Sequence, residues 1–149
     1  MIIGEGARQA LLGEFGNDRL ISGGSNVLLS GGVGNDLLQG GAGEQYFTGG
    51  LNVDFFSFTE ADAQPGVIDR ILDFTAIEGD RIGINAVLGI TNSLAGKGWT
   101  YIDSANFNGV AGELRFANGL LQGDTDGDRI ANLQIQLDGI NTFSPGWIS

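Results

Sequence analysis

The chain has 149 residues, the length of one domain, and a formal net charge of −11. Its seven Lys and Arg residues are spread along the whole sequence, which argues against nucleic acid and anionic membrane surfaces as partners. The lack of Cys and His excludes Cys/His and Ser/His/Asp nucleophilic catalysis and the usual zinc sites. Since no apolar run approaches the length of a membrane span, we predict a non-catalytic acidic module without membrane insertion.

Residues 4–57 divide without remainder into six nonapeptides, and the fourth, GGVGNDLLQ, fits the pattern G-G-x-G-x-D-x-U-x at every specified position. The eighth position is always large and apolar: Leu11, Leu20, Leu29, Leu38, Phe47 and Phe56. Burying one such side chain stabilises a fold by roughly 1.5 to 3 kcal/mol, and the Gly-rich openings suit tight turns. The spacing, which a flexible linker has no reason to keep, predicts a parallel β-roll in which each nonapeptide forms half a turn.

The sixth position carries an aspartate only in alternate units: Gln9, Asp18, Val27, Asp36, Gln45 and Asp54. Because a full turn of the roll takes two nonapeptides, one edge has every aspartate and the other has none. Carboxylate and backbone carbonyl oxygens are the ligands that Ca²⁺ prefers. We therefore predict calcium sites between the Asp18 and Asp36 turns and between the Asp36 and Asp54 turns, with a metal-free opposite edge.

The units GGVGNDLLQ and GEFGNDRLI resemble the repeats of the RTX, or haemolysin-type calcium-binding, family of bacterial proteins exported by type I secretion. The resemblance implies a parallel β-roll with Ca²⁺ in its turns, a disordered chain without calcium, and folding after export. It places Asp18, Asp36 and Asp54 at the ligand position of the family. The accompanying turn residues included in the candidate site are Gly13, Gly16, Gly31, Gly32, Gly34, Gly49 and Asn52.

Residues 58–65 form a polar turn that is expected to end the roll, so that residues 4–57 form the roll and residues 58–149 its cap. An irregular strand is expected over residues 67–74 and a short helix around residues 85–88. The first of these segments resembles the region that follows the roll in serralysin-type proteases and in the R-modules of alginate C-5 epimerases. On that resemblance Asp69 and Asp73 are candidate metal ligands, with surface carboxylates as the alternative interpretation.

Short strands are expected at residues 113–116, 119–122 and 133–137, the last from its alternation of apolar residues with glutamine. Asp124, Asp126 and Asp128 stand at alternate positions in the intervening loop, as in the opening of many calcium loops. Two interpretations remain for them, a calcium site or an acidic hairpin turn. Residues 141–149 resemble the secretion signal that ends serralysin-type C-terminal domains.

Together these features predict an all-β protein, a parallel β-roll of nonapeptide repeats capped by a C-terminal antiparallel element, in a single module over residues 1–149. Its expected function is to bind Ca²⁺ as a structural ligand, so that a secreted, extracellular polypeptide folds after type I secretion. The implied partners are calcium ions, the secretion machinery and a larger secreted polypeptide or catalytic domain. The alternative is a carbohydrate-binding accessory module of a secreted enzyme, with an alginate-like polysaccharide as partner.

Overall fold

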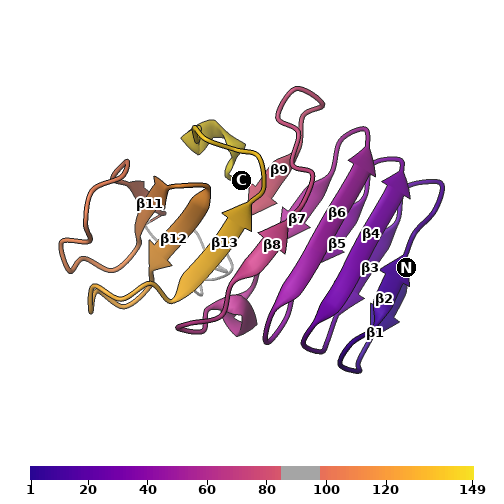
Figure 1. The fold of residues 1–149 in the computed structure, drawn as a ribbon, viewed down its shortest axis with the longest axis horizontal. Helices are drawn as coiled ribbons and strands as arrows, with labels where there is room; N and C mark the ends of the chain where they lie inside the picture. Colours follow the sequence, from indigo (N-terminus) through magenta and orange to yellow (C-terminus); the bar gives the residue numbers. More distant parts are fainter. Residues whose placement is uncertain (85–97) are drawn as a thin grey trace.

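The computed structural model describes residues 1–84 and 98–149, and its strands form two sheets (Figure 1). The five-stranded sheet has the order β1 (Ile2–Gly4), β3 (Arg19–Ser22), β5 (Leu37–Gln39), β7 (Phe55–Ser57) and β9 (Arg81–Gly83). The eight-stranded sheet has the order β10 (Thr100–Tyr101), β11 (Glu113–Ala117), β12 (Leu120–Asp124), β13 (Leu133–Leu137), β8 (Asp69–Ile71), β6 (Gln45–Leu51), β4 (Val27–Val33) and β2 (Ala10–Leu12). Short 3₁₀ helices span Glu60–Asp62 (η1) and Pro145–Trp147 (η3). The helix expected around residues 85–88 lies outside the described residues.

Successive strands of the repeats alternate between the two sheets, so each sheet pairs strands that are one full turn apart. In the five-stranded sheet Leu20 pairs with Leu38 and Leu38 with Phe56, at a spacing of 18 residues. The eight-stranded sheet repeats this register, with Leu29 paired to Phe47. All of these pairs are parallel. The predicted all-β fold, a parallel β-roll with two nonapeptides per turn, is confirmed.

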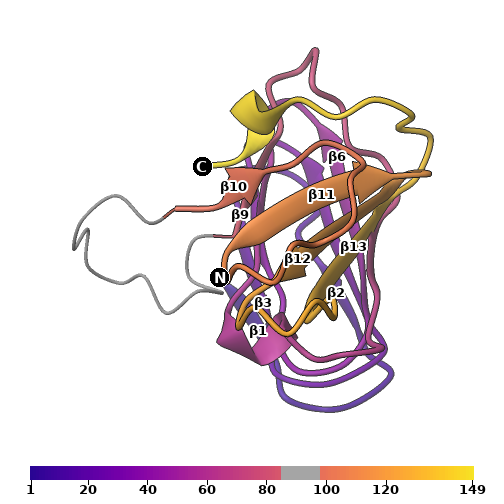
Figure 2. The same cartoon turned by 90° about the vertical axis from the view of Figure 1, so that its left-hand side faces the viewer.

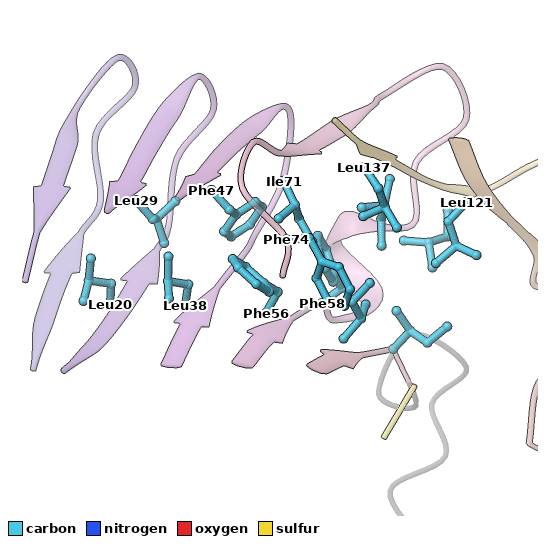
Figure 3. Close-up of a cluster of buried hydrophobic side chains, with 14 of the residues drawn as sticks. Leu20, Leu29, Leu38, Phe47, Phe56, Phe58, Ile71, Phe74, Leu121 and Leu137 are labelled. Atoms are coloured by element: carbon cyan, nitrogen blue, oxygen red, sulfur yellow. The ribbon is translucent and has the colours of Figure 1, made fainter. Parts of the chain in front are cut away.

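The eighth-position side chains meet between the two sheets and form the core of the roll (Figure 3). Leu20, Leu29, Leu38, Phe47 and Phe56 are all 0% exposed. Phe47 and Phe56 meet edge to face across the layer, with ring centroids 6.2 Å apart. The regular spacing seen in the sequence is therefore the spacing of a packed stack, which holds the turns at both edges in line.

Parallel pairing continues beyond Ser57 for one more turn. Strand β8 pairs with β6, which places Ile71 beside Phe47, and β9 pairs with β7, which places Ile82 beside Phe56. Both isoleucines are 0% exposed and supply the same inward side chain as the eighth position of the repeats. The expectation that residues 58–65 end the roll is therefore corrected: they form a longer connection, which contains η1, between two turns of the roll.

The C-terminal part closes one end of the roll. Strand β13 pairs in parallel with β8, whereas β12 and β11 add antiparallel strands, as their sequence pattern predicted. Viewed from this end, the C-terminal segment lies across the top of the two layers (Figure 2). The ring of Trp147 lies 5.2 Å from that of Phe74, and the Ser149 amide donates to the Ile82 carbonyl over 3.1 Å. The buried apolar end of the roll is thereby covered.

Candidate metal centre

One edge of the roll carries an aspartate immediately before each of the strands β3, β5, β7 and β9 of the five-stranded sheet. We call it the Asp edge, and its aspartates are Asp18, Asp36, Asp54 and, in the additional turn, Asp80. The amide of each aspartate donates to the Oδ1 atom of the next: Asp18 to Asp36 over 2.7 Å, Asp36 to Asp54 over 2.9 Å, and Asp54 to Asp80 over 2.9 Å. The repeats therefore stack their carboxylates in a single column.

The second oxygen of the two central carboxylates has no hydrogen-bond partner within residues 1–84 and 98–149. Asp36 and Asp54 are 3% and 1% exposed, and the Oδ2 atom of each is buried without a hydrogen bond. Each atom lies over the first glycine of its own unit, Gly31 or Gly49, where an added Cβ would collide with it. A buried anionic oxygen without a donor is costly, and a bound cation removes that cost. The residues present therefore fit a calcium ion.

Burial raises the pKa of these carboxyl groups. Desolvation raises the pKa of Asp54 to about 7, and the neighbouring charges of Asp80 and Asp36 add to the effect. The pKa of Asp36 is also raised, again mainly because the group is buried. Carboxylates that are buried close together repel one another. The folded state therefore favours binding of either a proton or a cation at these aspartates.

Backbone carbonyls approach the same column from the preceding turn. An added Cβ at Gly32 would collide with the Glu14 carbonyl oxygen, and one at Gly50 with the Gly32 carbonyl oxygen. At Gly34 the colliding atom would be the Gly16 oxygen. Glycine thus allows successive turns to bring main-chain oxygens close together, which supplies the second ligand type that Ca²⁺ uses.

The structure places the predicted turn residues on this one edge. Gly13, Gly16, Gly34 and Asn52 lie in the connections that lead to β3, β5 and β7, and Gly31, Gly32 and Gly49 lie at the ends of β4 and β6 that enter them. Asn52 has a positive φ of 84°, which asparagine tolerates better than most residues. The role of these residues as ligands remains a prediction.

The opposite edge, which we call the Gln edge, contains Gln9, Val27 and Gln45 at the sixth position. The Gln45 side chain is fully buried, and its Nε2 group donates to the Gly24 carbonyl over 2.9 Å and to the Ala42 carbonyl over 3.1 Å. Its Oε1 atom accepts from the Gly41 amide over 3.3 Å. The Gln45 side-chain amide thus bridges the backbone carbonyls of two successive turns, as a bound cation would. These hydrogen bonds stabilise a turn that has no carboxylate.

The structure separates Asp69 from Asp73. Asp73 accepts from the Gly49 and Gly50 amides, over 2.9 Å each, and so holds a turn of the Asp edge. Asp69 lies on the Gln edge, where its Oδ1 atom accepts from the Gln45 amide over 2.8 Å. Its Oδ2 atom is buried and has no hydrogen-bond partner among the residues that the structure describes. Desolvation raises the pKa of Asp69 to about 8, and the charge of Asp62 adds to the shift.

The loop between β12 and β13 brings Asp124, Asp126 and Asp128 together, with one carboxylate oxygen of each within 4.8 Å of the others. Asp124 accepts from the Gly127 amide over 2.6 Å and from the Arg129 amide over 2.9 Å, so the loop already holds this carboxylate in place. Both interpretations of the sequence, a calcium site and an acidic hairpin turn, agree with this arrangement.

Sequence reasoning missed Asp62 and Asp80 as candidate ligands. Asp80 lies one turn after Asp54, but at a spacing of 26 residues instead of 18, because residues 58–68 and 72–80 lengthen this turn. A local signal was nevertheless present, since Asp80-Arg81-Ile82 repeats the type of triplet in Asp18-Arg19-Leu20. Asp62 carries no such signal, because η1 brings it to the roll from outside the repeat pattern.

Comparison with known proteins agrees with this geometry. Residues 12–44 and 28–56 match the family model of the RTX calcium-binding nonapeptide repeat. No curated protein sequence matches the chain, and no helix within residues 1–84 and 98–149 is long and apolar enough to cross a membrane. Residues 12–56 therefore carry RTX calcium-binding repeats, and they form part of a calcium-binding β-roll module.

A solved structure extends the likeness over nearly the whole chain. The solution structure of the AlgE6R3 subunit from the Azotobacter vinelandii mannuronan C5-epimerase matches 98% of this chain and 80% of its own, at 29% identity and a TM-score of 0.69. The module is similar to the R-modules of alginate epimerases in both its repeats and its cap, as the sequence resemblance predicted.

Proposed function

We propose that calcium binding to the Asp edge drives the folding of this module outside the cell, after export by type I secretion. The observation that carries the proposal is the pair of buried Asp36 and Asp54 oxygens, which have no hydrogen-bond partner in the part of the chain that the structure describes. In this proposal Ca²⁺ is a structural ligand, the module spans residues 1–149, and it is a non-catalytic part of a larger secreted protein. On the sequence resemblance, residues 141–149 are the candidate secretion signal of this proposal.

The free energies are of the right size for such a switch. Extracellular calcium sites bind with dissociation constants of about 10⁻⁴ to 10⁻³ M, so a few millimolar Ca²⁺ adds roughly 1 to 2.5 kcal/mol per site. Inside a cell, where free calcium is low, carboxylate repulsion and the entropy of 27 glycines favour the open chain. Two or three sites then decide whether a marginally stable roll folds.

Counting bound calcium in aspartate variants tests the shared ligands. Asp36 and Asp54 each have an Asp-edge neighbour on both sides, whereas Asp18 lies at the first turn. We expect Asp36→Asn and Asp54→Asn each to weaken about two sites and Asp18→Asn about one, because asparagine removes the charge and keeps the shape. Isothermal titration calorimetry of each variant gives the number of ions.

Asp103→Asn is the matched control, because Asp103 is exposed and its positive φ of 59° suits asparagine. This variant should bind as many ions as the wild type. Equal losses in the Asp18, Asp36 and Asp54 variants would contradict shared sites, and unchanged binding in all three would contradict the proposed function.

The outer face of the eight-stranded sheet favours a second candidate function, polysaccharide binding. Tyr46, Arg70 and Gln136 stand in one cross-strand row and line a hollow together with Glu44 and Ile68. The neighbouring row joins Arg115, Gln122 and Gln134 by side-chain hydrogen bonds of 3.0 Å each. Amide, guanidinium and aromatic groups on one face of a sheet are suited to sugar hydroxyl and carboxylate groups, although the net charge of −11 opposes a polyanion.

Affinity electrophoresis in calcium, with alginate and with a neutral polysaccharide in separate gels, distinguishes this candidate. Retardation by alginate that is lost in the Arg70→Ala/Arg115→Ala variant would support polysaccharide binding by this face. Arg19→Ala is the control, because Arg19 is an exposed arginine of the other sheet. Unretarded migration in both gels would leave calcium-dependent folding as the function of the module.

A further inference from the structure

The Asp edge also carries exposed apolar side chains that calcium binding does not use. Three of them occupy the third position of the second, fourth and sixth nonapeptides, and we call them the apolar row: Phe15, Val33 and Leu51. Their exposed fractions are 83%, 40% and 56%. Two more exposed apolar side chains lie in the last two turns of the same edge, Val53 at 44% and Ile77 at 98%.

The strand register holds the apolar row in line. Phe15 pairs with Val33 in a parallel bridge, and Val33 pairs with Leu51 in the ladder between β4 and β6. Neighbouring strands lie about 4.7 to 4.9 Å apart, so the three residues follow one another along the roll at this spacing. The turns that carry them lie side by side in Figure 1. Single exposed apolar residues are common, whereas a contiguous set is typical of an interaction surface.

The Gln edge shows that the roll itself does not need this row. At the third position its units have Gly6, Gly24 and Ala42. Both edges turn the chain between the same two sheets, so a small residue at this position is sufficient for folding. The large apolar residues are therefore a property of the Asp edge alone.

The exposed area is that of one protein interface. Complete burial covers roughly 150 to 250 Å² for an aromatic side chain and roughly 60 to 120 Å² for an aliphatic one. Scaled by their exposed fractions, the apolar row, Val53 and Ile77 present roughly 300 to 500 Å² of apolar surface. A stable interface buries about 800 Å² on each partner, a little over half of it apolar. These side chains thus supply the apolar part of one interface.

A second copy of the same edge has the matching shape and charge state. A straight row with a constant spacing interdigitates with the same row turned round by a two-fold axis. The Asp-edge turns, residues 13–18, 31–36, 49–54 and 72–80, contain acidic residues and no Lys or Arg. Two such edges repel each other until cations bind, and each Ca²⁺ ion cancels two negative charges.

We infer that the apolar row is the interface through which two copies of the folded module associate, edge to edge, about a two-fold axis. This association goes beyond the proposed function, because it adds a partner to the edge that binds calcium. The contact is apolar and the charges that remain around it have one sign. Added NaCl should therefore strengthen the dimer, whereas an interface made of ion pairs would weaken.

Sedimentation velocity over a range of protein concentrations, in a few millimolar CaCl₂, tests the inference. The wild type should pass from the monomer to twice the monomer mass. Phe15→Ser/Leu51→Ser should raise the dissociation constant of the dimer roughly tenfold or more, because each change is made twice in the interface. Val110→Ser is the matched control, since Val110 is 59% exposed in the connection between β10 and β11, and its dimer should be unchanged.

Calorimetry on the same samples separates this inference from the calcium proposal. The double variant should bind as many ions as the wild type, because the side chains that it changes are exposed. A protein that binds no calcium but still dimerises through the apolar row would contradict the proposed function and leave this inference standing.

A dilution series of the wild type, followed by amide NMR spectra in calcium, gives a readout that does not depend on how a variant folds. Concentration-dependent shifts at residues 15, 33 and 51 and their neighbours support the interface. A wild type that stays monomeric would overturn the second copy as the partner. A dimer that persists in the double variant would also overturn the inference and would indicate another surface, such as the edge strands β1 and β2.

Discussion

Stripping calcium from the protein at pH 8 should remove most of its β-sheet circular dichroism, and returning a few millimolar Ca²⁺ should restore the signal. The reason is the burial of Asp36, Asp54 and Asp69, each of which has one carboxylate oxygen without a hydrogen-bond donor among the described residues. An uncompensated buried carboxylate costs several kcal/mol, and domains of this size are stable by only about 5 to 15 kcal/mol. Two or three such groups are enough to reverse the folding equilibrium.

Acidification provides the control, because protons can replace calcium at the same groups. The pKa of Asp54 is raised to about 7 and that of Asp69 to about 8, from an ordinary value of 3.8, chiefly by burial. The calcium-free folded chain therefore binds protons at Asp54 and Asp69 more tightly than the unfolded chain does, so protonation of these two groups stabilises the fold. Their stabilising effect is complete below about pH 4 and is lost as the pH rises through 7 to 8. Stripped protein should therefore recover structure between pH 8 and pH 5, and an unchanged β-sheet spectrum at pH 8 would contradict the role of calcium.

The repeated part of the fold was predictable because its physical requirement is periodic. Every half-turn needs one inward apolar side chain, and the parallel register follows from the 18-residue spacing between Leu20, Leu38 and Phe56. The alternation of Asp36 with Gln45 likewise indicated two different edges. Because each half-turn has the same packing requirement, the apolar residue recurs at the same position of every nonapeptide, whichever residues occupy the other positions.

The last turn was not predictable in the same way. Its two connections are longer than those of the repeats, so Ile71 and Ile82 fall out of the 18-residue period although they pack as its next members. The periodic pattern cannot indicate where a chain of irregular length returns to the roll. The position of the Asp62 carboxylate depends on η1 folding back over Gly40. This is a tertiary contact, and no local sequence pattern indicates it.

Glu14 shows why a departure from the repeat can be harmless at one end of the roll. It occupies the slot of the second glycine, which Gly32 and Gly50 fill in the next two units of the Asp edge, and it adopts a positive φ of 72°. An added Cβ at Gly32 or Gly50 would collide with a carbonyl of the preceding turn on the Asp edge. Glu14 belongs to the first turn of that edge. No earlier turn of the Asp edge packs against it, so its position does not require glycine.

Gly32→Ala should therefore abolish calcium-dependent folding, whereas Gly16→Ala should only weaken it. The two glycines have almost the same backbone angle, φ +107° and +104°, but an added Cβ at Gly32 would collide with the Glu14 carbonyl, and one at Gly16 meets nothing within 4 Å. Alanine at Gly16 thus carries only the cost of a left-handed residue, about 1 to 2 kcal/mol. At Gly32 the next turn must also move away, which disrupts the Asp36 column. Calcium titration by circular dichroism measures both variants, and equal midpoints would show that close stacking of the turns does not determine folding.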